Sequence, residues 1–146
     1  MDKESFTGFL VSDFNTQNLA SFLQQDSSVP KVRCVSAAFG QVIPPLMKMA
    51  QGATQAFDFV TVWAQPESVF LSFKKALEHE SFSPAEVLEE VESFASLLVQ
   101  VLRRTKFIFV PAWILPSYRR DFGLLEMQSE NGISNLLSRM NLTLAQ

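Results

Sequence analysis

The chain has 146 residues, the size of one domain with a single sizeable hydrophobic core. Its formal net charge of −3 offers no broad basic field to a nucleic-acid backbone. No stretch approaches the ~20 apolar residues of a membrane span, and the acidic start at residues 1–4 is unlike a secretory signal. We therefore expect a cytoplasmic protein that binds neither nucleic acid nor membrane.

Four hydrophobic runs predict four strands that alternate with helices. The runs cover residues 6–11, 32–37, 57–63 and 107–110. This alternation is typical of a parallel sheet with right-handed crossovers. We predict a flavodoxin-like, three-layer α/β fold with strand order 2-1-3-4. The last run has no polar alternation, as in a strand covered on both faces.

Helix signals follow the first two strands. Asn15 or Thr16 can cap a first helix. Its apolar positions at helical spacing are expected to face the sheet; they are Leu19, Phe22 and Leu23. Two prolines, Pro44 and Pro45, suit the opening turn of a second helix that ends before Gly52.

Three further helices are predicted in the second half of the chain. A helix rich in Phe and Leu follows the third strand to about Glu80, and residues 83–86 form a capping box that opens the next one. That helix carries an apolar stripe at Val87, Leu88, Val91, Phe94, Ala95, Leu98, Val101 and Leu102. Its glutamates at positions 89, 90 and 92 are expected to be a solvated face. A last helix covers about residues 133–144.

The final helix is followed by no further strand, so the fold is expected to lack a last strand. The surface left open beside the fourth strand or the last helix should then expose Trp113, Leu115 and Leu136. Unpaired strand edges and apolar patches favour association, so we expect a dimer or a mixed population of monomers and oligomers.

The lone Cys and the lone His do not predict a metal site. Cys34 lies inside an apolar run and is expected to be a small buried side chain. His79 lies toward the end of a predicted helix, where solvent exposure is expected. One Cys and one His offer no ligand cluster, and no glycine-rich phosphate loop follows a strand. We therefore expect no cofactor.

The turn after the first strand, Ser12-Asp13-Phe14-Asn15-Thr16, resembles the Gly-Asp-Ser nucleophile loop of SGNH hydrolases. In that register Ser12 takes the glycine position and Phe14 the nucleophile position. A phenyl ring cannot attack a carbonyl, and the Ser12 hydroxyl starts from a different part of the turn. The resemblance therefore implies that the hydrolase reaction is lost.

The other blocks of the SGNH pattern are also degraded. Gly40 could occupy the position of the glycine that contributes to the oxyanion hole. Only an amide, Gln65, remains where the third block normally has Gly-x-Asn-Asp. The closing Asp-x-x-His motif is absent, so the catalytic triad cannot be assembled from these positions.

The wider pattern resembles the N-terminal SGNH-like region of FkbH-like proteins. The matching stretches are the first loop, residues 38–42, residues 62–67, residues 110–113 and a late Met140-Asn141-Leu142. FkbH-like proteins continue into a HAD-type domain that loads a glyceryl unit onto an acyl carrier protein in polyketide-type biosynthesis. The Asp-x-Asp-x-Thr motif of that domain is absent here. The resemblance implies that residues 1–146 form one SGNH-like domain, the N-terminal fragment of a longer biosynthetic protein.

We expect a non-catalytic binding or scaffold domain whose partner is a HAD-type domain in the same protein or an acyl carrier protein. The degenerate pocket is expected to contain Ser12, Asp13, Phe14, Asn15, Gly40, Gln65 and Trp113. One alternative is a small acyl-ester hydrolase that uses Ser12, with His79 or a second chain supplying the base. Another is a module that binds a small molecule or an anion without turnover.

Overall fold

The computed structural model describes residues 5–28 and 30–146, so the expectation for residues 1–4 lies outside the described residues. Contacts divide the chain into two compact units, which are described one at a time. The first unit combines the chain up to Ala64 with Leu97–Pro111. The second unit combines Gln65–Ser96 with Ala112–Gln146.

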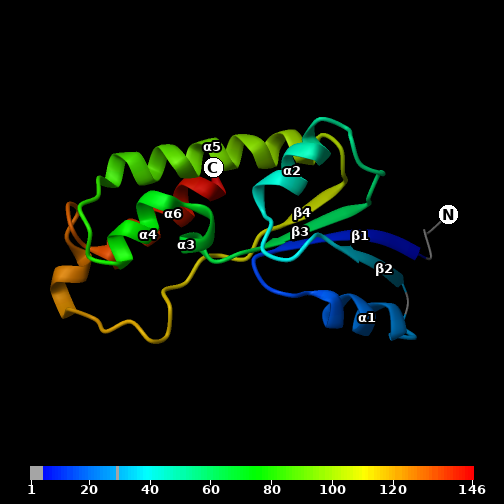
Figure 1. The fold of residues 1–146 in the computed structure, drawn as a ribbon, viewed down its shortest axis with the longest axis horizontal. Coiled ribbons are helices and arrows are strands. Elements are labelled where there is room, and N and C mark those ends of the chain that lie inside the picture. Colours follow the sequence, from blue (N-terminus) through cyan, green and yellow to red (C-terminus); the bar gives the residue numbers. More distant parts are fainter. Residues whose placement is uncertain (1–4, 29) are drawn as a thin grey trace. The chain divides into compact units, whose positions relative to one another are not determined.

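The first unit contains a parallel sheet of four strands among the described residues (Figure 1). The strands are β1 Ser5–Ser12, β2 Lys31–Ser36, β3 Phe59–Trp63 and β4 Phe107–Phe109. Their order is β2-β1-β3-β4, and each neighbouring pair is parallel. The predicted α/β class and strand order are confirmed. Because β1 and β3 are parallel, their carboxyl ends lie at the same end of the sheet, where Ser12 is the register partner of Trp63.

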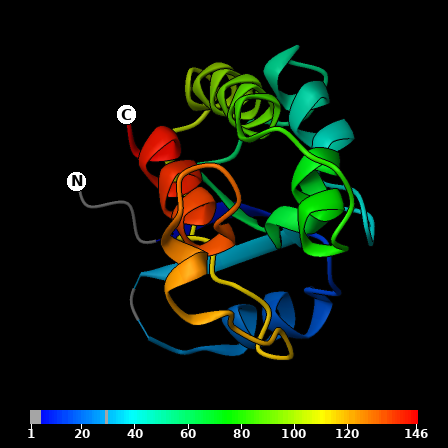
Figure 2. The same ribbon diagram turned by 90° about the vertical axis from the view of Figure 1, so that its left-hand side faces the viewer.

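Helices α1 (Gln17–Gln25) and α2 (Ile43–Ala50) lie on opposite faces of this sheet, as Figures 1 and 2 show. The prolines of α2 occupy its first turn, where their missing N–H groups cost no hydrogen bond. Gly52 follows the helix with φ of 74°, a left-handed conformation that glycine adopts without strain. Helix α1 begins at Gln17, next to the predicted cap residues, and α2 ends at Ala50, before Gly52 as predicted.

The prediction for the apolar face of α1 is partly wrong. Phe22 is 79% exposed and Leu19 is 37% exposed. The face toward the sheet instead carries Ala20 and Leu23, which pack in a cluster around Leu10. Two polar side chains complete it, because Thr16 and Gln24 bond to β2 through the Ser36 hydroxyl and the Cys34 carbonyl. The N-cap residue Thr16 and the three helix positions recur at i, i+4, i+7 and i+8, the spacing of one helix face. The outer part of the contact between α1 and the sheet is therefore made by hydrogen bonds and not by the ring of Phe22.

The strand β4 is also not covered as predicted. It lies at one edge of the described sheet, and the side chains of Phe107 and Phe109 are 53% and 55% exposed. The covered strands are the inner two, where Val11, Val60 and Val62 are almost completely buried. A run without polar residues therefore does not by itself separate a central strand from an edge strand.

The second unit is helical in the described residues. It contains α3 Pro66–Val69, α4 Leu71–Leu77, part of α5 Pro84–Leu102, the 3₁₀ helix η1 Gly123–Met127 and α6 Ile133–Ala145. The continuous helix predicted up to Glu80 is interrupted at Phe70, whose φ and ψ of −110° and 110° are extended. The stripe of α5 is confirmed at Val87, Val91, Phe94, Leu98 and Val101, whereas Leu102 is 46% exposed.

An aromatic cluster explains the break at Phe70. The Phe70 ring packs edge-on against Phe94 and Trp113, with ring centroids 5.6 and 5.1 Å apart. The main chain of Trp113 exchanges two hydrogen bonds with the Asn141 side chain, at 2.8 and 2.9 Å. Trp113 is therefore buried, and so is Leu136, which corrects the expectation that both are exposed; Leu115 is half-buried.

Glu90 is another correction, because it is not simply part of a solvated face. Its carboxylate accepts a hydrogen bond of 2.6 Å from the Ser72 hydroxyl and a longer one from the Ser72 N–H. Ser72 lies in the first turn of α4, so Glu90 satisfies a donor that the helix itself leaves open.

Within the described residues, no helix combines the length and the apolar character needed to cross a membrane.

Candidate functional site

The predicted nucleophile loop forms a tight turn at the carboxyl end of β1. The Ser12 hydroxyl oxygen accepts a hydrogen bond from the Phe14 N–H at 3.1 Å. Ser12 is only 3% exposed, so its hydroxyl serves the turn rather than solvent. The Phe14 ring packs edge-on against Trp63, the last residue of β3, with centroids 5.2 Å apart. The expected packing of Phe14 against a neighbouring apolar side chain is confirmed.

The remaining first-unit residues of the predicted pocket have local structural roles. The Asn15 carboxamide oxygen accepts the Gln17 N–H at 2.9 Å and so starts α1 with an Asx turn. Gly40 lies in the turn after β2 with φ of 71°, and nothing lies within 4 Å of the position a Cβ would take. Gly40 is therefore required for its backbone conformation rather than for a close approach. Asp13 is partly buried within the same turn as Ser12.

The last two predicted site residues belong to the second unit. Gln65 is exposed and precedes α3, where its carbonyl accepts the Ser68 N–H at 3.0 Å. Trp113 is 6% exposed and belongs to the aromatic cluster around Phe70. The structure thus brings Ser12, Asp13 and Phe14 into one turn, whereas Trp113 is a core residue of its own unit.

Nucleophilic chemistry at Ser12 would require an accessible hydroxyl and a base that accepts its proton. The hydroxyl is buried and already engaged as an acceptor. The single His, His79, has a left-handed backbone with φ of 61°, and its ring packs edge-on against Phe122 in the second unit. Among the described residues, no three His, Cys, Asp or Glu side chains form a group that could hold a metal ion.

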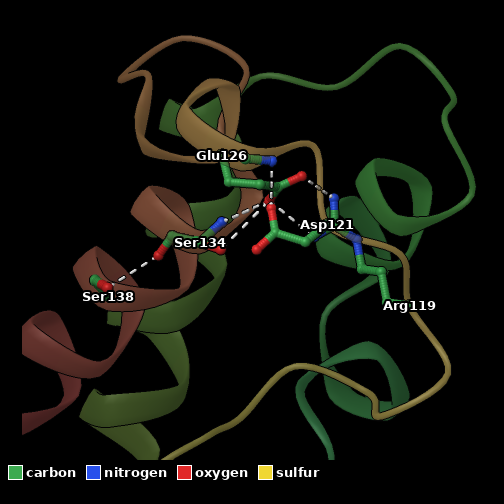
Figure 3. A network of polar contacts seen from close by, with 6 residues as sticks. Arg119, Asp121, Glu126, Ser134 and Ser138 are labelled. Atoms are coloured by element: carbon green, nitrogen blue, oxygen red, sulfur yellow. Dashed lines mark hydrogen bonds and ion pairs between the residues drawn. The ribbon is translucent and has the colours of Figure 1, made fainter.

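The second unit contains a buried ion pair that the sequence did not indicate (Figure 3). Arg119 donates two parallel hydrogen bonds, of 2.8 and 2.9 Å, to the two carboxylate oxygens of Glu126. Ser134, in the first turn of α6, adds its N–H and its hydroxyl to the same carboxylate. Asp121 stabilises the connecting turn by accepting the N–H of Gly123 at 2.7 Å. No periodic pattern joins Arg119 to Glu126, because both lie in a largely irregular segment.

The hydrogen bonds from Arg119 hold the pKa of Glu126 below its ordinary value, although burial opposes this shift. The Coulomb attraction of Arg119 and the hydrogen bonds from Ser134 act in the same direction as the first cause. Both residues line a cavity of about 390 Å³ in the second unit, together with His79, Phe82 and Phe122. Because the two charges are paired, neither presents an unbalanced charge to this cavity.

Comparison of the chain with models of protein families, with curated proteins and with solved structures finds no match. The structure by itself defines a small α/β domain with a four-strand parallel sheet in the order 2-1-3-4.

Proposed function

We propose that this chain is a non-catalytic, SGNH-like binding or scaffold domain of the FkbH-like type, acting in the cytoplasm. In this proposal it serves a HAD-type domain, in the same protein, that transfers a glyceryl unit to an acyl carrier protein in polyketide-type biosynthesis. The partner is that HAD-type domain or the carrier protein. The motif resemblance supports the family, and the structure of the first turn supports the absence of catalysis.

One observation carries the non-catalytic part of the proposal. The nucleophile position of the turn is occupied by Phe14, which packs on Trp63. Ser12, two positions earlier in the turn, is buried, and its hydroxyl oxygen accepts the N–H of Phe14. A hydroxyl used in this way stabilises the turn and is withdrawn from an incoming acyl group. In this proposal the surface at this end of the sheet binds a partner, and Ser12 does not act as a nucleophile.

The proposal predicts no hydrolysis of short acyl esters. Purified chain should release p-nitrophenol from p-nitrophenyl acetate and butyrate at the rate of a buffer blank. Ser12→Ala is the matched control, since any true Ser12-dependent turnover must disappear in this variant. Turnover by the unmodified chain that is lost in Ser12→Ala would overturn the non-catalytic assignment in favour of a hydrolase.

The partner is tested by direct titration of the chain. Isothermal calorimetry with a purified glyceryl-loading HAD-type domain and, separately, with its acyl carrier protein should detect saturable binding to one of them. Phe14→Ala should weaken that binding, because it removes an aromatic side chain that is 39% exposed at the carboxyl end of β1. Absence of binding to both proteins would contradict the family assignment without affecting the result of the ester assay.

A further inference from the structure

A hollow of about 420 Å³ lies in the first unit, away from the predicted pocket. It is lined by Thr7 near the start of β1, by Asp58 before β3 and by the segment 103–106 before β4. These are the amino ends of the strands. Thr7 and Ser12 are five residues apart in β1, so the hollow and the carboxyl-end turn are separated by about 16 Å. Its volume is in the range of small-molecule sites, roughly 300–1,000 Å³.

The base of this hollow is held in place by Asp58. The Asp58 carboxylate, in a residue that is 6% exposed, accepts the N–H and the hydroxyl of Thr7 at 2.9 and 3.0 Å. The Asp58 carbonyl accepts the Lys106 N–H at 3.0 Å, and the Thr105 hydroxyl bonds to the Phe57 carbonyl. Asp58 thus ties β1 and the segment before β4 to one point. The backbone that carries the basic side chains is therefore fixed.

Three cations surround the hollow, although the chain as a whole is acidic. Lys106 lies 3.2 Å from Asp58, which balances one positive charge. Arg103 and Arg104 are exposed, and within the described residues neither forms an ion pair. The guanidinium of Arg104 lies over Gly52, whose Cβ would approach it at 3.5 Å. Among the residues that the structure describes, two arginines without an ion-pair partner therefore line the hollow, and the carboxylate of Asp58 is paired with Lys106.

The position of the two arginines also complements the carboxyl end of α5, where cations stabilise the exposed carbonyls. That role requires only charge near the helix end. It does not account for the hollow or for Lys106, which lies four residues past the end of the helix at Leu102. Guanidinium groups are suited to bidentate binding of phosphate, and the lysine adds a point charge.

We propose that the hollow bounded by Thr7, Asp58, Arg103, Arg104 and Lys106 binds the phosphate group of a small organic phosphate ester. Arg103 and Arg104 hold the phosphate oxygens, and the Lys106 ammonium, paired with Asp58, keeps that carboxylate from repelling the phosphate. The space beside Ala56 and Phe57 accommodates the organic part of the ester. This site is independent of the function proposed for the carboxyl-end turn.

The test uses phenyl phosphate as the probe and ¹H–¹⁵N NMR titration of the full chain as the measurement. Saturable shifts should appear at the amides of Thr7, Thr105 and Lys106. Phenol, which has the same ring without phosphate, should cause none. Inorganic phosphate should shift the same amides with lower affinity. Phosphatidic acid vesicles distinguish a lipid headgroup from a small ester, and binding to vesicles alone would overturn the proposal.

The double variant Arg103→Gln/Arg104→Gln should weaken phenyl phosphate binding about tenfold or more, since each lost charge-assisted bond lowers the affinity. Arg120→Gln is the matched control, because Arg120 is exposed in the second unit, and it should leave affinity unchanged. Circular dichroism confirms that the exposed variants remain folded. Equal affinity of the double variant, shifts confined to other amides, or no saturable binding at millimolar probe would each overturn the proposal.

Discussion

Both oxygens of the Glu126 carboxylate are hydrogen-bonded in the folded chain, and this makes stability depend on pH. Its pKa is lower when folded than when unfolded. The stabilisation is therefore fully present above the unfolded pKa and is lost as the pH falls through the folded pKa. We predict that the second unit loses stability on acidification below the ordinary carboxyl pKa, measured by thermal melts across an acidic pH series.

The matched variants for this prediction are Glu126→Gln and the double change Arg119→Met/Glu126→Leu. The single change leaves the Arg119 charge buried without its partner, which costs about 3–5 kcal/mol. The double change removes both charges and should recover most of that loss. In both variants the part of the acid dependence that comes from Glu126 should disappear. An unchanged pH profile in these variants would assign the acid sensitivity to other groups.

Cys34 gives a second prediction for a single residue. It is 3% exposed, and burial raises the pKa of its thiol. Because the thiolate is the reactive form, the folded chain should react with Ellman's reagent far more slowly than the chain in guanidinium chloride. Ala20→Gly, which loosens the cluster around Cys34, should speed the reaction. Equal rates for folded and unfolded chain would contradict the buried position.

The two residues differ in how far the sequence could predict them. An uncharged Cys inside an apolar run has one favourable environment, so the burial of Cys34 followed from its neighbours. The Arg119 and Glu126 pair depends on how an irregular segment folds back on α6, which no local pattern specifies. The same holds for Asp58, whose bond to Thr7 spans 51 positions.

Among the secondary-structure elements, the start of α6 depends on a glycine for space. A Cβ on Gly132 would lie 2.3 Å from the Glu126 carbonyl oxygen and 2.5 Å from that of Gln128. We predict that Gly132→Asn destabilises the second unit by about 3 kcal/mol, since the backbone must shift to make room. Gly40→Asn is the control, because Asn tolerates the left-handed conformation and nothing lies near the Cβ position. Similar urea midpoints for the two variants would contradict this difference.

The elements themselves were largely predictable, because capping and breaking residues are local signals. Pro84 opens α5, and the two prolines of α2 lie in its first turn. The break at Phe70 was not predictable, since only the packing of its ring on Phe94 and Trp113 favours an extended backbone there. The exposure of Phe22 was not predictable either, because helical spacing identifies apolar positions but not which of them face the sheet.

The exposed edge of the sheet predicts self-association. Phe107 and Phe109 lie on β4, an edge strand of the described sheet, and more than half of each side chain is exposed. Such edges pair readily with another chain. We expect a dimer or a mixed monomer–oligomer population in light scattering at high concentration. A strictly monomeric profile there would contradict this expectation.

Phe109→Lys should shift the population toward monomer, since a charged edge disfavours strand pairing. Phe22→Lys makes the same replacement on α1, where an exposed phenyl ring is present without a strand edge, and should leave the population unchanged. An equal shift in both variants would assign the association to general surface hydrophobicity.

The strand order was predictable because parallel strands joined by right-handed crossovers have few arrangements. The division into two units was not, since it depends on contacts between segments far apart in the chain. The turn that holds Ser12 and Phe14 was predictable because these residues are neighbours in sequence. The positions of Gly40, Gln65 and Trp113 depend on contacts between distant parts of the chain, which no local pattern specifies.

The division of the chain has a consequence for how this gene can be cut and recombined. Each unit is assembled from two separate stretches, and α5 contributes its early turns to one unit and its last turns to the other. A break between Ala64 and Gln65 would leave the first fragment without β4. Neither unit is therefore encoded by one continuous segment of the gene. The shortest continuous segment that encodes all four described strands also encodes the residues between β3 and β4.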